Sequence, residues 1–135
     1  MKRIILLTAL ILSFKGFSQN ITLKVEITGY KSNKGMAYIA VYKSEQEFLK
    51  KPTIGKIVKI ENNKAVVIFN DLPKGEYAIS SYHDENGNGK LDTNFMGIPK
   101  EDYAVSNNAK GFMSAPKYKD AKFIAKESKT ITMKI

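Results

Sequence analysis

The 135-residue sequence contains no cysteine and no tryptophan, only one histidine and only one arginine. Without cysteine the chain has no disulfide, no thiolate ligand and no bacterial lipoprotein attachment site, and one histidine alone cannot build the usual four-coordinate zinc site. Because Arg3 is the only arginine, the planar fork that recognises phosphates and bases is missing from the rest of the chain. We therefore expect no nucleic-acid partner, despite a formal net charge of +9.

Long hydrophobic runs are also scarce, and the most apolar one lies at the N-terminus. Lys2 and Arg3 precede an apolar run over residues 4–12, and Gly16 and Ser18 are small residues ahead of Gln19. This pattern predicts a Sec-type signal peptide over residues 1–18, because the run is too short to cross a bilayer. We expect a secreted or periplasmic protein that is not a lipoprotein and has no transmembrane segment once the signal is removed.

Residues 19–135 have the length of a single domain. They hold 19 lysines, once Lys2, Arg3 and Lys15 are set aside from the 22 basic residues, against 13 acidic residues. The lysines are scattered along the chain, which is typical of solvated strand edges and outer faces, and a weak attraction to anionic glycan or lipid surfaces is the lesser alternative. We expect one monomeric domain over residues 19–135.

Alternation of apolar and polar residues predicts an all-β fold. Residues 21–28 show it most clearly, and shorter β-rich runs follow at 36–42, 57–60, 65–69, 76–82, 122–125 and 130–135. We expect an antiparallel β-sandwich of about seven strands, transthyretin-like or immunoglobulin-like, with a long ordered loop over residues 93–120. The first two strands are expected to form a hairpin, as are the two that flank Asn62-Asn63. A capping-box pattern predicts one short helix between Ser44 and Pro52.

Residues 84–92 read D-E-N-G-N-G-K-L-D, which matches the first part of a calcium-binding loop. Oxygen-bearing side chains occupy loop positions 1, 3, 5 and 9, a glycine occupies position 6, and position 7 can offer its backbone carbonyl. Ca²⁺ requires six to eight oxygen ligands, so a short segment can surround it only by pointing alternate residues inward and turning sharply once. The predicted metal site consists of Asp84, Asn86, Asn88, Lys90 and Asp92, with Gly89 at the turn.

The calcium template is incomplete at position 12, where Phe95 stands instead of a bidentate glutamate. Asn94, Glu101, Asp102 or water remain as candidates to complete the shell. With two carboxylates in the loop, we expect weak binding, with a dissociation constant on the order of 10⁻⁴ to 10⁻³ M, and hence a structural ion. The alternative is a polar Asn/Gly turn that holds itself by hydrogen bonds without metal.

Residues 69–78, F-N-D-L-P-K-G-E-Y-A, resemble the strand-turn-strand of transthyretin-like, carboxypeptidase-regulatory-like and Cna-B-like sandwich domains. Together with H-D-E-N-G-N-G-K-L-D-T-N-F at 83–95, G-I-P-K-E at 97–101 and S-N-N-A at 106–109, the chain resembles a narrower group, the exported bacterial domain of unknown function 2141. The resemblance implies a secreted or periplasmic β-sandwich and carries no established activity.

Three functions are compatible with these residues. The favoured one is an exported, non-catalytic module with a structural calcium loop at 84–95. The alternative is a metal-independent binding module of the cell envelope that contacts a protein, peptide or glycan through the apolar 93–120 loop, which would require exposed Phe95, Tyr103, Phe112 and Tyr118. A third is a hydrolase that uses His83 with a serine such as Ser81 or Ser114. An isolated histidine is a weak motif, so we expect no enzyme.

Overall fold

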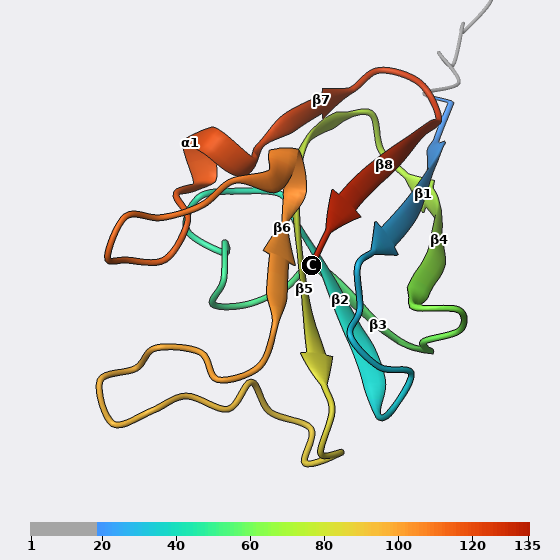
Figure 1. Cartoon of the computed structure of the whole chain (residues 1–135). Helices are drawn as coiled ribbons and strands as arrows, with labels where there is room; N and C mark the ends of the chain where they lie inside the picture. The colour runs from blue at the N-terminus through green and yellow to red at the C-terminus, as the bar shows by residue number, and fades with distance from the viewer. Residues whose placement is uncertain (1–18) are drawn as a thin grey trace, which may run out of the picture.

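The computed structural model describes residues 19–135, which form two packed β-sheets (Figure 1). The predicted signal peptide, residues 1–18, lies outside the described residues. The first sheet has the order β4-β1-β8, and the second has the order β3-β2-β5-β6, with β7 also paired to β5. The strands are β1 (Ile21–Thr28), β2 (Met36–Tyr42), β3 (Ile54–Lys59), β4 (Lys64–Leu72), β5 (Gly75–Asp84), β6 (Tyr103–Val105), β7 (Phe123–Ala125) and β8 (Lys129–Lys134).

The main core lies between the two sheets. The side chains of Ile21, Leu23, Val25 and Ile27 in β1 are all buried, as the alternation predicts, because every second residue of a strand points to the same face. Partners such as Ile39 and Ile79 come from the opposite sheet. The predicted all-β sandwich is confirmed, with eight strands rather than about seven. One pairing is not antiparallel, because β1 and β8 run parallel.

Both predicted hairpins are wrong in their pairing. β1 pairs with β4 and β8, whereas β2 pairs with β3 and β5, so the chain crosses from one sheet to the other between β1 and β2. At the second site Asn62 and Asn63 do adopt positive φ, 51° and 59°, and Glu61 bridges to Lys64. β3, which precedes this turn, and β4, which follows it, belong to different sheets. Alternation defines which face of a strand is buried, but not which strand lies beside it.

The predicted helix between Ser44 and Pro52 is also absent from the described residues. This segment makes a single helical turn, in which the Phe48 N–H donates to Ser44 O at 3.1 Å. Leu49 then adopts φ 57°, which ends the turn, since a left-handed residue cannot continue a right-handed helix. The α-helix that the structure does contain is α1 (Tyr118–Ala121), accompanied by the short 3₁₀ helix η1 (Ser106–Asn108).

A second, smaller group of buried side chains lies outside the main core, and we call it the small core. Its aromatic rings pack edge to face: Phe48 lies 5.4 Å from Tyr42 and 5.6 Å from Tyr118 between ring centroids. The predicted long loop therefore contains the edge strand β6, η1 and α1, and β6 and α1 deliver apolar side chains to this group. The small core consists of Tyr42, Phe48, Ala78, Val105, Tyr118 and Ala121. Within residues 19–135, no helix has the length and apolarity to cross a membrane.

Candidate functional site

The predicted calcium loop begins where β5 ends. Asp84 is the last residue of β5, lies opposite Met36 of β2, and is only 1% exposed. Gly35 approaches it so closely that a Cβ at this position would lie 1.9 Å from the Asp84 carbonyl oxygen, and its φ of 67° also favours glycine. The turn before β2 therefore fixes the start of the loop.

The Asp84 carboxylate organises the first half of the loop. Its Oδ1 accepts a hydrogen bond from the Asn88 N–H at 3.1 Å, and its Oδ2 accepts one from the Gly89 N–H at 2.8 Å. The Asn88 N–H is also 3.2 Å from Asn86 Oδ1, and Asn88 Oδ1 accepts from the Lys90 N–H at 2.9 Å. The φ values of Gly87 and Gly89, 72° and 76°, allow the chain to wrap around this carboxylate.

The second half of the loop closes on Asp92. The side-chain amides of Asn86 and Asn88 donate to the two Asp92 carboxylate oxygens at 2.6 and 2.7 Å. Hydrogen bonds from Asn88 and then from Asn86 hold the pKa of Asp92 below its usual value. The structure thus brings together Asp84, Asn86, Asn88 and Asp92, whereas Lys90 joins them through its N–H.

Of the candidates to complete the shell, Glu101 is the one that contacts the loop. Its Oε2 accepts the Asp92 N–H at 3.0 Å, and the neighbouring Lys100 N–H donates to Asp92 O at 2.7 Å. The Asn94 carboxamide oxygen instead accepts from backbone N–H groups in its own turn, and Asp102 forms an ion pair with Lys31 at 2.8 Å. Sequence spacing alone could not choose among the three.

The other Glu101 oxygen has no partner. Among residues 19–135, Oε1 is the one buried side-chain nitrogen or oxygen atom that makes no hydrogen bond. Such groups are rare in native proteins, because a desolvated carboxylate oxygen without a partner is costly. This oxygen belongs to a residue that already contacts Asp92, so it marks the place where a cation would fit.

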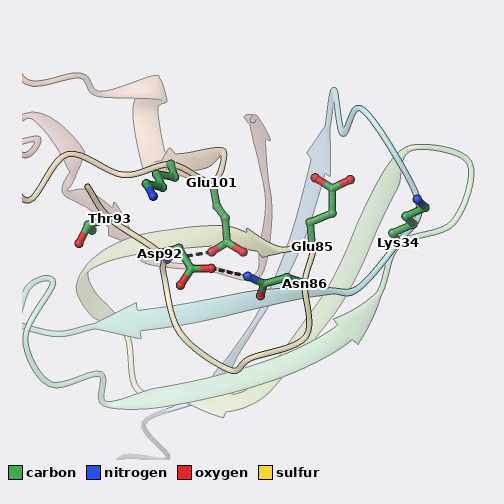
Figure 2. A pocket seen from close by; sticks show the side chains of 7 residues that line it. Lys34, Glu85, Asn86, Asp92, Thr93 and Glu101 are labelled. Atoms are coloured by element: carbon green, nitrogen blue, oxygen red, sulfur yellow. Dashed lines mark hydrogen bonds between the residues drawn. The ribbon is translucent and has the colours of Figure 1, made fainter. Parts of the chain in front are cut away.

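An open hollow of about 630 Å³ adjoins these groups, with a mixed lining of acidic, amide and basic side chains. Figure 2 shows Asp92, Glu101 and Asn86 directed toward one another on one side of it, with Glu85 and Lys34 on the other. The Glu85 carboxylate is engaged by the Ser32 hydroxyl at 2.9 Å. Within the described chain, no cluster of three or more His, Cys, Asp or Glu side chains is arranged to hold a metal. Any ion here would thus depend on amide and backbone oxygens as well.

His83, the residue considered for hydrolysis, is buried at the end of β5. Its Nε2 lies 2.6 Å from the Lys34 carbonyl oxygen, and its ring packs edge to face on Tyr30 at 5.2 Å. The buried Ser81 hydroxyl lies 3.5 Å from the Tyr30 hydroxyl, and Ser114 is exposed in the loop between η1 and α1. These contacts support a structural role for His83 in joining β5 to the turn before β2.

The apolar side chains of the 93–120 segment divide into two groups. Phe95 and Phe112 are 97% and 90% exposed, and Tyr103 is 40% exposed. Tyr118 is buried in the small core, where its hydroxyl donates to Glu76 at 2.8 Å. Of the four side chains that a binding loop would expose, Phe95, Phe112 and Tyr103 are therefore accessible, and Tyr118 is not.

Comparison with known proteins gives a family but no activity. A family model described as "Uncharacterized protein conserved in bacteria (DUF2141)" matches residues 25–133, nearly all of the described chain. No curated protein and no solved structure matches the sequence.

Proposed function

Because the chain belongs to the DUF2141 family of uncharacterised bacterial proteins, we propose a function from the loop itself: an exported, non-catalytic β-sandwich module stabilised by a calcium ion. The ion would be held by the loop over residues 84–92 together with Glu101. Calcium suits this site because all the available ligands are oxygens, with no thiol and no free imidazole among them.

The unpartnered Glu101 Oε1 is the observation that carries this proposal. A buried hydrogen-bonding group without a partner costs about 1–3 kcal/mol, and more when it is charged. A cation beside Glu101 and Asp92 would compensate both carboxylates at once. Glu101 would thereby replace the glutamate that the loop lacks at Phe95, although it comes from further along the chain.

Binding also requires a specific rearrangement of the two asparagines. Their side-chain nitrogens now face the Asp92 carboxylate, at 2.6 Å from Asn86 and 2.7 Å from Asn88. A half-turn of each carboxamide would present its oxygen instead, which suits a cation, and would give up the hydrogen bonds that these oxygens now accept from the Asn88 and Lys90 N–H groups. The alternative, a turn that needs no metal, is supported by these same hydrogen bonds but leaves Glu101 Oε1 without a role.

The proposed ion would act on stability rather than as a signal. An ion present at about one hundred times its dissociation constant adds about 2.7 kcal/mol to the free energy of unfolding. This is a sizeable share of the stability of a small domain, which is about 5–15 kcal/mol. A chain without disulfides gains particularly from such a contribution.

Thermal melts in calcium, in magnesium at equal ionic strength and in chelator test the proposal. We expect calcium to raise the melting temperature of the protein and chelator to reverse the rise. Glu101→Gln should lose most of this rise, whereas Glu61→Gln, on the exposed turn between β3 and β4, should keep it. A melting temperature that does not respond to millimolar calcium, or that responds equally in both variants, would contradict the proposal.

The exposure of Phe95 and Phe112 supports a second role, in binding at the cell envelope without need of the metal. Exposing large apolar side chains to water is unfavourable, so their exposure here favours a surface that binds a partner. This role would use Phe95 and Phe112, whereas the proposed ion would use the loop over residues 84–92 and Glu101, so the two roles are compatible.

A further inference from the structure

Two protruding turns carry the most exposed apolar side chains of the described chain, and we call them the first tip (residues 93–100) and the second tip (residues 110–116). Phe95 and Met96 lie at the first tip, and Phe112 and Met113 lie at the second. Phe95, Phe112 and Met113 lie almost completely in solvent, and Met96 is 67% exposed. Apolar residues of this size are usually scattered singly over a protein surface, whereas here they occur as adjacent pairs.

The first tip is an ordered turn that holds its apolar side chains outward. The Asn94 carboxamide oxygen accepts hydrogen bonds from the Met96 and Ile98 N–H groups at 2.8 and 3.0 Å. The Asn94 N–H donates to Ile98 O at 2.8 Å, and Gly97 adopts φ 77°. Thr93 also bridges to Pro99, which closes the base of the turn.

The second tip is also tightly folded. A Cβ on Gly111 would lie 1.8 Å from the Ser114 carbonyl oxygen, so only glycine fits where the two arms of this turn meet. Met113 adopts φ 53°, an uncommon conformation for a long side chain that the turn imposes. Phe112 and Met113 are therefore displayed by the backbone rather than left behind by loose packing.

The two tips lie on the same side of the molecule. Residues from the base of the first tip and from the start of the second line one groove of about 380 Å³ along β6. Figure 1 shows both turns projecting from the side of the sandwich on which β6 lies. An occupant that meets one tip is thus in a position to meet the other.

The charges within the two tips are all positive. Residues 93–100 and 103–119 contain no aspartate or glutamate, and their lysines are Lys100, Lys110, Lys117 and Lys119. Asp102 pairs with Lys31, but Lys100 adjoins Asp92 and Glu101, and Asp120 directly follows Lys119. Lys110 and Lys117 remain on either side of the second tip, and their charge favours a negatively charged occupant.

We propose that the two tips dock this protein on the surface of an anionic lipid bilayer. Protruding apolar pairs insert into the soft boundary between headgroups and acyl chains, whereas a folded protein partner would need to provide a matched pocket for each. The lysines would remain at headgroup level, where each cation near an anionic surface strengthens attachment by about fivefold. The inference does not rest on the calcium proposal, because no ligand of the proposed ion lies at either tip.

The absence of tryptophan offers a direct probe. Phe112→Trp introduces a single indole at the second tip, and Ile124→Trp introduces one on β7 at another exposed apolar position. Both variants are mixed in chelator with vesicles of phosphatidylcholine alone or of phosphatidylcholine with phosphatidylglycerol. We expect the emission of the tip indole to shift to the blue with the anionic vesicles only, and that of the β7 indole to stay unchanged.

Vesicle co-sedimentation of the untagged chain separates insertion from charge attraction. Phe95→Ser with Phe112→Ser should reduce binding to anionic vesicles by at least about tenfold, since two inserted aromatic rings are lost, while Ile124→Ser should bind as the parent does. Failure of the parent to bind anionic vesicles at low salt would overturn the proposal and leave the tips to a protein partner. Undiminished binding of the double serine variant would also overturn it, because attachment would then be electrostatic alone.

Discussion

The small core and the proposed calcium loop, residues 84–92 with Glu101, both adjoin β5, but they satisfy their polar groups in different ways. Beside the apolar residues of the small core, the buried Ser106 hydroxyl accepts the Ile79 N–H at 2.9 Å and donates to Ala121 O at 2.6 Å, so this hydroxyl has both a donor and an acceptor as partners. In the calcium loop, Asp84 and Asp92 are bonded, yet Glu101 Oε1 has no partner. Among the described residues, the first region leaves no buried side-chain polar atom without a hydrogen bond, and the second leaves one.

This difference separates two ways of ordering an irregular segment. Residues 103–109 and 117–121 are ordered by burying aromatic and aliphatic side chains, which needs no further component. Residues 84–102 bury little apolar surface and rely on short-range polar contacts, which are individually weak in water. A bound ion would contribute to the second region and leave the first unaffected.

The largest effect is expected in the small core. Phe48→Ala should lower the free energy of unfolding by about 3–5 kcal/mol, because the ring is buried between Tyr42 and Tyr118. Chemical denaturation in calcium and in chelator should give the same loss. A loss that depends strongly on calcium would break the distinction between the two regions.

Ser106→Ala should have the next largest effect. It leaves the Ile79 N–H and the Ala121 carbonyl without their partner in a buried position, at about 1–3 kcal/mol. Ser114→Ala, at an exposed serine on the second tip, serves as the control and should change stability little. Equal losses in the two variants would show that the Ser106 bridge does not order this region.

A smaller effect is expected at high pH. Burial raises the pKa of Tyr118 to about 12, with a further contribution from its hydrogen bond to Glu76. Because the folded pKa exceeds the ordinary value of 10.0, this contribution to stability is complete below pH 10 and is lost as pH rises toward 12. Tyr118→Phe should flatten the fall in melting temperature over this window, and an unchanged slope would contradict the assignment.

Much of the sandwich could be predicted from local pattern. The β1 alternation identified its buried face, and the last two strands, β7 and β8, lie where the sequence placed them. Strand partners could not be predicted in this way, because the turns at residues 29–35 and at Asn62-Asn63 fit either a hairpin or a crossing between sheets. The capping-box pattern failed because Glu47 accepts the Thr53 hydroxyl at 3.0 Å rather than capping a helix.

The candidate site was predictable within the loop and not beyond it. The spacing of Asp84, Asn86, Asn88 and Asp92 suffices to bring their side chains together, because all four lie in one short loop that turns sharply at Gly87 and Gly89. Glu101 reaches the loop only because the chain returns through the first tip and pairs Lys100 with Asp92. Such a return depends on tertiary structure, which spacing does not encode.

Backbone amide NMR of the ¹⁵N-labelled protein during a calcium titration tests the central proposal most directly. Signals of Asn88, Gly89 and Asp92 should move and saturate with a dissociation constant on the order of 10⁻⁴ to 10⁻³ M, whereas that of Ser106 in the small core should stay in place. Loop signals that do not respond to calcium well above this range would contradict a metal site at Asp84, Asp92 and Glu101.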